Sequence, residues 1–474
     1  MLSLFTPATG YPDLEAKIAY GLARVAIEAF GEESVCLKNN GNFYTVKVDA
    51  DNGGLCKLDL TFNFLARRLL SSMYIPFKTP GIPGRSASSI IMKENDDITL
   101  RNHMSVIFYH DNKKTDNCCR HQAVSVGNII GLTASTSFYN KRDGLDIQLQ
   151  HKDPKDNASP KLPRRPTNPN NICKACAMLS LLGVWYASFI FSIKGREITV
   201  LPIPKKEISG VDLQAVFASQ HQLRNSFFNQ EIPQILIPLV FLSRIPSSAE
   251  LLEDFDLFIA ILTRQQGYHV DGILLAPSKS YLAFIKESPF NTATIDLIIR
   301  AQAFDSFLML NKAIYYKDVN SSGTFAREYS KETSNNNFTN LLFPDTAKYL
   351  LKEIAMIDQK IIENPAISSL AKTLRYFIRE KKYGYADDIR NARLNTRDFE
   401  ETIAKMLREG ELRRLNQEQD KKAGRKVENW IHLPKESEIK EIFRLANEDF
   451  EATKLALVIL AFSFPQKADE QEKD

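Results

Sequence analysis

The chain has 474 residues, which is enough for two or three domains that each bury a core. With 44% hydrophobic and 25% charged residues, its composition is ordinary for a soluble globular protein. The formal net charge of +4 is too small to indicate nucleic-acid binding by itself, so charge has to be followed segment by segment.

The first seventy residues have the pattern of a helix packed on antiparallel strands. Tyr11-Pro12-Asp13 opens a helix that ends at Gly31. Its apolar residues recur at helical spacing: Leu14, Ile18, Leu22, Val25 and Ala29. Strands are predicted at 35–37, 43–48 and 55–62, with the Asn-Gly pair 40–41 as a hairpin turn, and a helix is predicted at 65–70.

From residue 112 to residue 171 the chain is polar and rich in proline, which predicts a surface insertion. The stretch from Ala177 to Ile193 has no charged residue and is near the length of a membrane span. Gly183 interrupts it, and Phe189-Ile190-Phe191 has strand character. We therefore interpret it as a buried helix that runs into a buried strand.

The next part alternates strands and helices. Strands are predicted at 197–202, 235–242 and 270–275, and helices at 211–223, 249–263 and 294–310. The polar stretch 318–340 predicts a domain boundary or a mobile loop. Beyond it the pattern is helical, with Asn364 as N-cap before Pro365 and another helix starting at Asn395 or Thr396.

Together these elements predict an α+β fold: a mixed helix-on-antiparallel-sheet body with a cysteine-bearing insertion, followed by an all-α bundle. The predicted parts are an N-terminal α+β part at 1–110, the insertion at 111–180, an α/β continuation of the body at 181–340 and the helical bundle at 341–474.

Four of the six cysteines form two tight groups, at residues 118–121 and 173–176. Two short ligand pairs separated by a long insertion are typical of a structural Zn²⁺ site. The predicted ligands are Cys118 or Cys119, His121, Cys173 and Cys176. The alternative is that Cys173 and Cys176 are buried thiols on a helix. Because the sequence has no His-Glu-x-x-His motif that would supply a base, we expect the metal to be structural.

The N-terminus has no basic segment followed by a long apolar run, so we expect no secretory signal. Cysteines in such a chain are thiols or metal ligands more often than disulfides. The sequence therefore predicts a cytoplasmic protein.

No strong catalytic motif occurs in the sequence: it has no Gly-x-x-x-x-Gly-Lys-Ser/Thr phosphate loop, no Gly-x-Gly-x-x-Gly and no Gly-x-Ser-x-Gly. His110-Asp111, with His103 upstream, is the one catalytic-looking group, and we interpret it as a surface pair. We therefore expect a binding or scaffold protein rather than an enzyme.

Clusters of basic residues are the remaining functional signal. Residues 372–426 contain sixteen Lys or Arg and ten Asp or Glu, while residues 428–474 contain eleven acidic and six basic residues. The alternative is a solvated helix face with ion pairs four residues apart. Two groups are the candidate nucleic-acid ligands: Lys78, Arg85, Lys161, Arg164 and Arg165 in loops, and Arg379, Lys381, Lys382, Arg413 and Arg414 in the bundle.

The opening segment LFTPATGYPDLEAKIAYGLARVAIEAFG, the Cys173-x-x-Cys176 before an apolar helix and the helical C-terminal part together resemble one family. The chain resembles the large subunit of the type I-A CRISPR Cascade effector, a protein of antiviral defence. The resemblance implies a non-catalytic subunit of an RNA-guided DNA-surveillance complex. It implies contact with the 5′ handle of the crRNA and recognition of the protospacer-adjacent motif in double-stranded target DNA.

The resemblance also implies that the protein helps to open the target DNA and to recruit the helicase–nuclease. The implied partners are the crRNA, the target duplex, other Cascade subunits and the helicase–nuclease, with no membrane partner.

Two other readings stay open. One is a stand-alone nucleic-acid-binding regulator in which Ile367–Trp430 forms a winged-helix unit with Gly410–Trp430 as the wing. The other is an enzyme of an unrecognised class that uses His103, His110 and Asp111.

Overall fold

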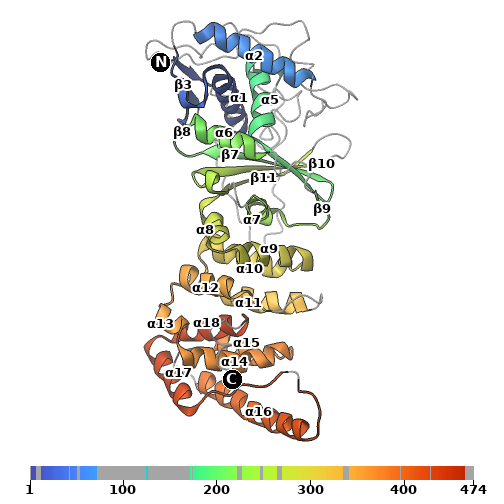
Figure 1. Ribbon diagram of the computed structural model, residues 1–474, viewed down its shortest axis with the longest axis vertical. Helices are drawn as coiled ribbons and strands as arrows, with labels where there is room; N and C mark the ends of the chain where they lie inside the picture. Colours follow the sequence, from blue (N-terminus) through green and yellow to red (C-terminus); the bar gives the residue numbers. More distant parts are fainter. Residues whose placement is uncertain are drawn as a thin grey trace, which may run out of the picture. The chain divides into compact units, whose positions relative to one another are not determined.

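The computed structural model describes residues 2–6, 12–41, 43–50, 54–71, 124–125, 171–172, 174–220, 227–245, 249–263, 269–334, 341–394, 397–427 and 429–464. The chain divides into two compact units. The first unit comprises residues 1–238 and 244–279, and the second comprises residues 239–243 and 280–474. Figure 1 shows that the labelled strands belong to the first unit and that the second is helical.

The first sheet is antiparallel and joins the N-terminus to a segment far along the chain. Its order is β1-β3-β2-β8, formed by β1 (Leu2–Phe5), β2 (Val35–Asn39), β3 (Tyr44–Val48) and β8 (Ile208–Ser209). In the β2–β3 hairpin Val35 pairs with Val48 and Asn39 with Tyr44. Alternation in β2 buries Val35 and Leu37 and leaves Lys38 exposed, so one face of the sheet packs against the core.

The second sheet has the order β11-β10-β7-β6-β9. All neighbours are antiparallel except β6 and β9, which are parallel. Its strands are β6 (Phe189–Ile193), β7 (Arg196–Pro204), β9 (Phe227–Phe228), β10 (Phe255–Thr263) and β11 (His269–Pro277). A separate short pair joins β4 (Val124–Ser125) to β5 (Asn171–Ile172).

Two helices in backbone contact form the core of the first unit: α1 (Pro12–Phe30) and α5 (Lys174–Ala187). A Cβ atom on Gly21 would lie 2.0 Å from the carbonyl oxygen of Leu179, and one on Gly183 would lie 1.9 Å from that of Lys17. Glycine is therefore required at both positions by the close approach of the two backbones.

The same core holds polar groups in specific pairs. Lys17 and Asp13, one turn apart on α1, form an ion pair with Nζ and Oδ2 3.0 Å apart, and both residues are buried. Tyr20 donates from its hydroxyl to the carbonyl oxygen of Pro202 at 2.5 Å, which ties α1 to β7. Burial raises the pKa of Tyr20 well above its ordinary value, so the phenol stays a donor.

Around this core lie α2 (Gly54–Ser71), α6 (Gly210–Ser219), α7 (Ile237–Ser243) and the short 3-10 helices η1 (Glu32–Ser34), η6 (Gln234–Leu236) and η7 (Ala249–Leu252). Ser209 caps α6, because its Oγ accepts from the Asp212 amide at 3.1 Å. None of the described helices is both long and apolar enough to cross a membrane.

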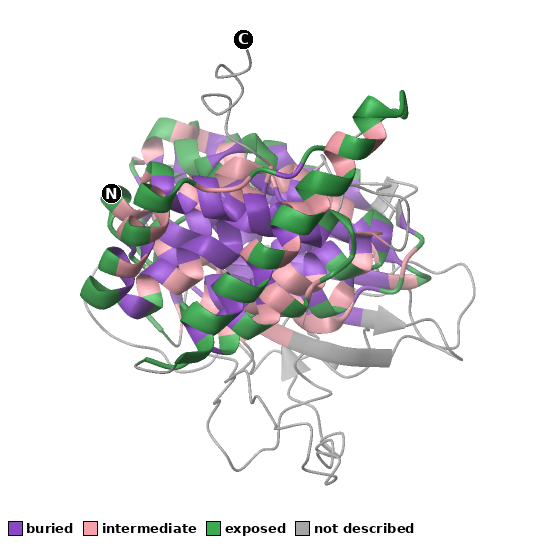
Figure 2. Ribbon diagram, turned by 90° about the horizontal axis from the view of Figure 1, so that it is seen from below, coloured by how far each residue is buried: buried purple, intermediate pink, exposed green. Residues whose placement is uncertain are grey.

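The second unit consists of helices packed on one another, with buried residues on their inner faces and exposed residues on their outer faces (Figure 2). The helices are α8 (Lys279–Glu287), α9 (Pro289–Ala301), α10 (Phe304–Tyr316), α11 (Val319–Ser334), α12 (Pro344–Tyr349), η8 (Leu350–Ile354), α13 (Gln359–Ile362), α14 (Pro365–Arg379), α15 (Gly384–Asn391), α16 (Arg397–Lys422), α17 (Glu436–Glu448) and α18 (Phe450–Ala461).

Two contacts hold the end of the chain to earlier helices. Buried Arg375 on α14 donates from Nη2 to the carbonyl oxygen of Leu460 at 2.7 Å. Leu342 pairs with Ser463 in an isolated bridge, in which the Leu342 amide donates to Phe462 and the Phe464 amide donates to Leu342. The second unit is therefore closed by segments about 120 residues apart, a separation read from the residue numbers.

The predicted α+β class is confirmed, and so are most of the individual elements. The helix at the N-terminus ends before Gly31, whose φ of 87° is the left-handed conformation expected there. The uncharged stretch from Ala177 is a buried helix that runs into the buried strand β6. Asn364 caps α14 and accepts from the Ala366 amide at 2.9 Å.

Three predictions assigned the wrong element. Residues 55–62 lie in α2, because Leu58 and Phe62 continue a buried helical stripe to Leu65 and Ala66, while Leu60 is 74% exposed. Residues 235–242 lie mainly in α7, and residues 255–263 form β10. These last two are short apolar runs, whose length and periodicity do not distinguish a buried helix from a central strand.

Two further predictions fall inside helices. The polar stretch predicted as a boundary or loop at 318–340 contains α11, whose buried residues include Ser322, Phe325 and Tyr329 at helical spacing. Residues 410–422, predicted as the start of a wing, continue α16 as a helix. The four predicted parts of the chain stay a prediction, although α9, α10 and α11 belong to the same unit as the later helices.

The α1–α5 contact gives the first testable prediction. Gly183→Ala places a methyl group inside the backbone of α1, so we expect it to lower the free energy of unfolding by about 3 kcal/mol or more. Gly21→Ala is expected to behave alike. Gly384→Ala, where nothing lies within 4 Å of the added Cβ, is the control. Equal urea midpoints for Gly183→Ala and Gly384→Ala contradict the close approach.

Candidate nucleic-acid interface

Most of the predicted site residues lie outside the described residues. These are the loop cations Lys78, Arg85, Lys161, Arg164 and Arg165, the zinc candidates Cys118, Cys119, His121 and Cys173, and the group His103, His110 and Asp111. Cys176 is described and is fully buried within α5. Among the described residues no three His, Cys, Asp or Glu side chains are grouped as a metal site.

Cys36 is the described cysteine with a polar partner. It donates from Sγ to Glu207 Oε1 at 3.1 Å. Burial, and then the hydrogen bond to Glu207, raise the pKa of the Cys36 thiol to about 11. Cys36 is therefore a protonated thiol at neutral pH, unlike the thiolate that acts as a nucleophile or metal ligand.

The bundle cations are described, and three of them lie at the end of α14. Arg379 is the last residue of the helix, and Lys381 and Lys382 form the turn that follows. Lys381 has φ 59°, and the amides of Lys381 and Lys382 donate to the carbonyls of Ile378 and Phe377. These bonds satisfy the last carbonyls of α14 and leave all three cationic side chains exposed.

The other two cations, Arg413 and Arg414, lie on the second half of α16. The buried residues of α16 run from Phe399 to Gly410, and no later residue of the helix is buried. Leu412 and Leu415 are 63% and 56% exposed. The second half of α16 therefore presents most of its circumference to solvent.

Glu409 brings two of the predicted residues together. Its carboxylate accepts from Lys382 Nζ at 2.8 Å and from the Tyr385 hydroxyl at 2.6 Å, and it lies 3.6 Å from Arg413 Nη2. The hydrogen bonds from Lys382 and Tyr385 hold the pKa of Glu409 below its ordinary value. Desolvation, and then the bond to Glu409, raise the pKa of Tyr385 to about 12.

Gln417 attaches the returning chain to α16. Its amide donates to the Tyr376 hydroxyl at 3.3 Å and to the Asn429 carbonyl at 2.7 Å, and it accepts from the Ile431 amide at 3.1 Å. Trp430 is thereby held beside the helix with 48% of its surface exposed. Lys421 Nζ lies 5.6 Å from the centre of the Trp430 ring, within cation–π range.

We call the cationic residues of this surface the basic edge. They are Arg379, Lys381, Lys382, Arg413, Arg414, Lys421, Lys422, Arg425 and Lys426. Some are neutralised locally, since Arg414 pairs with Glu418 at 3.3 Å and Arg425 with Asp420 at 3.0 Å. Within the described residues, Arg379, Lys381 and Lys422 form no ion pair, so these three keep their charge for an external partner.

The segment after α16 is fixed to α14 by a serine–histidine contact. Ser369 Oγ lies 2.7 Å from His432 Nε2 and donates to Glu438 Oε2 at 2.9 Å. Thr373 donates to the His432 carbonyl at 2.7 Å. In a hydrolase triad the carboxylate bonds the imidazole, whereas here it bonds the hydroxyl. Ser369 is 4% exposed, so we assign these contacts to holding residues 429–435 on α14.

The sequence prediction identified the cations of this surface and missed its aromatic and acidic residues. Tyr376, Tyr385 and Trp430 alternate with basic residues between positions 376 and 430, and that interleaving was the available signal. Nothing in the sequence singles out Glu409, because its three partners come from two elements that meet only in the folded bundle.

Comparison with known proteins adds no family to this description. A scan against protein-family models and a search of curated proteins each found no match to the chain.

The Glu409 cluster gives a pH-dependent prediction. Because folding lowers the pKa of Glu409, its contribution to stability is complete above the ordinary value of 4.5 and is lost as pH falls through the lower folded value. We expect Glu409→Gln to reduce the free energy of unfolding by about 0.5–1 kcal/mol at pH 7, since the group is partly exposed.

Below the folded pKa of Glu409 the difference between Glu409→Gln and the parent should vanish, which denaturant titrations at neutral and acid pH will measure. Glu401→Gln is the matched control on the same helix, because Glu401 has a single partner, Lys405, at 3.9 Å. A difference that persists unchanged at low pH contradicts the role assigned to the Glu409 carboxylate.

Proposed function

We propose that the chain is a non-catalytic, nucleic-acid-binding large subunit of an RNA-guided DNA-surveillance complex, and that the basic edge contacts a single nucleic-acid strand. The observation that carries the proposal is that cations without an internal ion pair lie beside exposed aromatic rings on one surface of the bundle. The resemblance to the large subunit of the type I-A Cascade effector supports the assignment to a CRISPR complex.

Physical chemistry favours a single strand as the ligand of this surface. Lysine and arginine neutralise phosphates without reading sequence. Aromatic side chains stack on unpaired bases, and every base offers a ring face, so such binding tolerates any sequence. Trp430, half exposed and flanked by Lys421 and Lys422, has both properties within one turn of helix.

The other partners follow from the same proposal. The loop cations Lys78, Arg85, Lys161, Arg164 and Arg165 are our candidates for duplex contact at the protospacer-adjacent motif. The crRNA 5′ handle, the other Cascade subunits and the helicase–nuclease are the remaining proposed partners. In such complexes base pairing reads the sequence, while the protein holds backbones and a short motif.

A structural Zn²⁺ is part of the proposal. In the register of the β4–β5 pair, Val124 lies opposite Ile172 and Ser125 lies opposite Asn171. His121 precedes this pair by three positions and Cys173 follows it directly, so the chain connects both cysteine groups closely to one short ladder. Thiolate and imidazole are donors that Zn²⁺ prefers. The buried position of Cys176 suits a closed site that excludes solvent.

The basic edge is tested by removing its three cations that form no ion pair. We expect the triple variant Arg379→Ala, Lys381→Ala and Lys422→Ala to weaken single-strand binding by the assembled complex about 10- to 100-fold. The salt slope of the binding constant should fall by about 2, from about 0.7 per phosphate contact on a single strand. Fluorescence anisotropy at several salt concentrations measures both.

Three exposed lysines elsewhere in the same unit form the matched control: Lys312→Ala, Lys352→Ala and Lys360→Ala. Glu409→Gln, which releases Lys382 and Arg413, should strengthen binding. Unchanged affinity and slope in the triple variant would sink the proposal. Tight, sequence-specific duplex binding by the chain alone would instead support the stand-alone regulator.

The zinc proposal is tested by elemental analysis of the pure full-length chain. We expect about one Zn²⁺ per chain, and Cys173→Ser should abolish its retention because a structural site with four protein ligands tolerates no missing thiolate. Cys56→Ser, at an exposed position on α2, is the control and should keep the metal. A parent protein without zinc overturns this part of the proposal.

A further inference from the structure

A cavity of about 270 Å³ lies in the first unit, at the β6–β7 hairpin and the segment that leads into α7. Lys194 and Gly195, with φ 43° and 77°, form the two-residue turn between the strands. Residues 231–237 form the facing wall. The volume is just below the range of drug-sized pockets, so it fits a small ligand.

The interior of the cavity is aliphatic. Five buried isoleucines border it: Ile193, Ile198, Ile232, Ile237 and Ile261. They come from β6, β7, β10 and the wall segment, so the sheet and the wall fix their positions. Branched aliphatic side chains offer dispersion contacts and no stacking face. The interior therefore suits a branched or linear aliphatic group rather than an aromatic ring.

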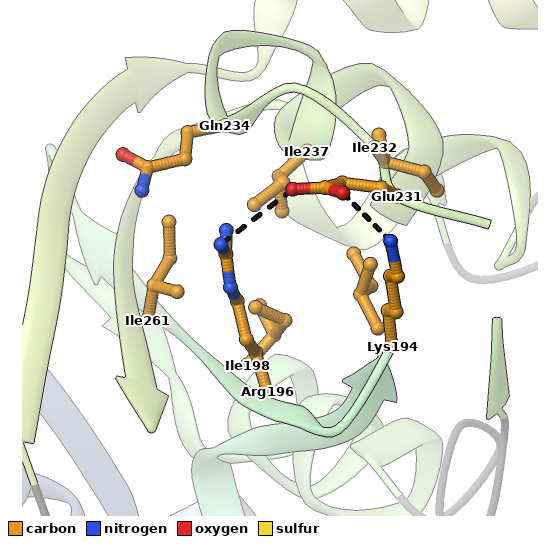
Figure 3. A pocket seen from close by; sticks show the side chains of 9 residues that line it. Lys194, Arg196, Ile198, Glu231, Ile232, Gln234, Ile237 and Ile261 are labelled. Carbon is orange, nitrogen blue, oxygen red and sulfur yellow. Dashed lines mark hydrogen bonds and ion pairs between the residues drawn. The ribbon is translucent and has the colours of Figure 1, made fainter. Parts of the chain in front are cut away.

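The rim holds two cations around one carboxylate. Glu231 Oε2 accepts from Lys194 Nζ at 2.8 Å, and Glu231 Oε1 lies 3.7 Å from Arg196 Nη2. Figure 3 shows the carboxylate lying between the two cationic groups, above the isoleucines. The hydrogen bond from Lys194 holds the pKa of Glu231 below its ordinary value. Gln234 adds a neutral amide to the rim.

This rim is easily opened. The side chains of Lys194 and Glu231 are both 59% exposed, and ion pairs so exposed contribute little to stability. Glu231 thus occupies a position between two cations that any other carboxylate can take. With Glu231 displaced, the rim presents two positive charges directly above an aliphatic interior.

We propose that this cavity binds an aliphatic carboxylate, with the hydrocarbon group on the isoleucines and the carboxylate between Lys194 and Arg196 in place of Glu231. Two sources share this chemistry, a free branched-chain or short-chain acid and the C-terminal aliphatic residue of a peptide. The site lies in the first unit and does not rest on the function proposed for the basic edge.

Binding is measured on the full-length chain with isotope-labelled isoleucine methyl groups, by NMR titration with isocaproate. Single Ile→Val variants assign the signals of Ile232 and Ile261. We expect isocaproate to shift the signals of the cavity isoleucines. Isocaproamide, which lacks the charge, should bind about tenfold more weakly or less, because a charge-assisted bond is lost. Acetate, which lacks the chain, should not bind measurably.

The variants separate this site from a merely structural ion pair. Lys194→Met and Arg196→Met should each weaken isocaproate binding about tenfold. Glu231→Gln removes the internal competitor and should tighten binding several-fold, which a structural role for Glu231 does not predict. Lys206→Met is the matched control, a surface lysine of the same unit that pairs with Asp254 at 2.5 Å.

N-acetyl-leucine and N-acetyl-leucinamide identify the source of the carboxylate. Tighter binding of N-acetyl-leucine than of isocaproate supports a peptide C-terminus, and binding of isocaproate alone supports a free acid. Equal binding of isocaproate and its amide, or unchanged or weaker binding in Glu231→Gln, overturns the proposal.

Discussion

The contact between α1 and α5 is the constraint on which the first unit depends. Two glycines, Gly21 and Gly183, allow the helix backbones to meet without intervening side chains. Because α1 also packs on β2 and β3, and Tyr20 bonds the carbonyl of Pro202 on β7, this helix pair fixes both sheets. Packing so close leaves no room for adjustment, since protein interiors are as dense as crystals of small molecules.

The second unit is organised differently, by polar contacts at the edges of an apolar core. Buried Arg375, the bridge at Leu342 and the Ser369–His432 contact each join segments far apart in the chain. The basic edge depends on two of these connections, Glu409 and Gln417, which hold the α14–α15 turn and the returning chain against α16. Its charge is therefore a property of positions, because some cations are neutralised by neighbours and others are not.

Prediction from the sequence succeeded where one periodicity was strong and failed where two competed. The stripe from Leu14 to Ala29 and the cap at Asn364 have a single interpretation, and both are confirmed. In residues 55–62 the alternation of Leu58, Leu60 and Phe62 imitates a strand, but the longer helical stripe prevails. The apolar run of β10 is buried between β7 and β11, an environment that periodicity alone does not reveal. Helix α11 buries serine and threonine, so its polarity resembled that of a loop.

The sequence by itself determined the α+β class, the helical C-terminal part and which cations are candidates for nucleic acid. Those properties follow from local periodicity, caps and charge, which each short segment carries alone. Only the tertiary structure decided which cations stay without an ion pair, where Trp430 lies and how Lys194 and Arg196 come to bracket Glu231 above five isoleucines. Those arrangements join residues from separate strands, helices and loops, and their distances are set by packing.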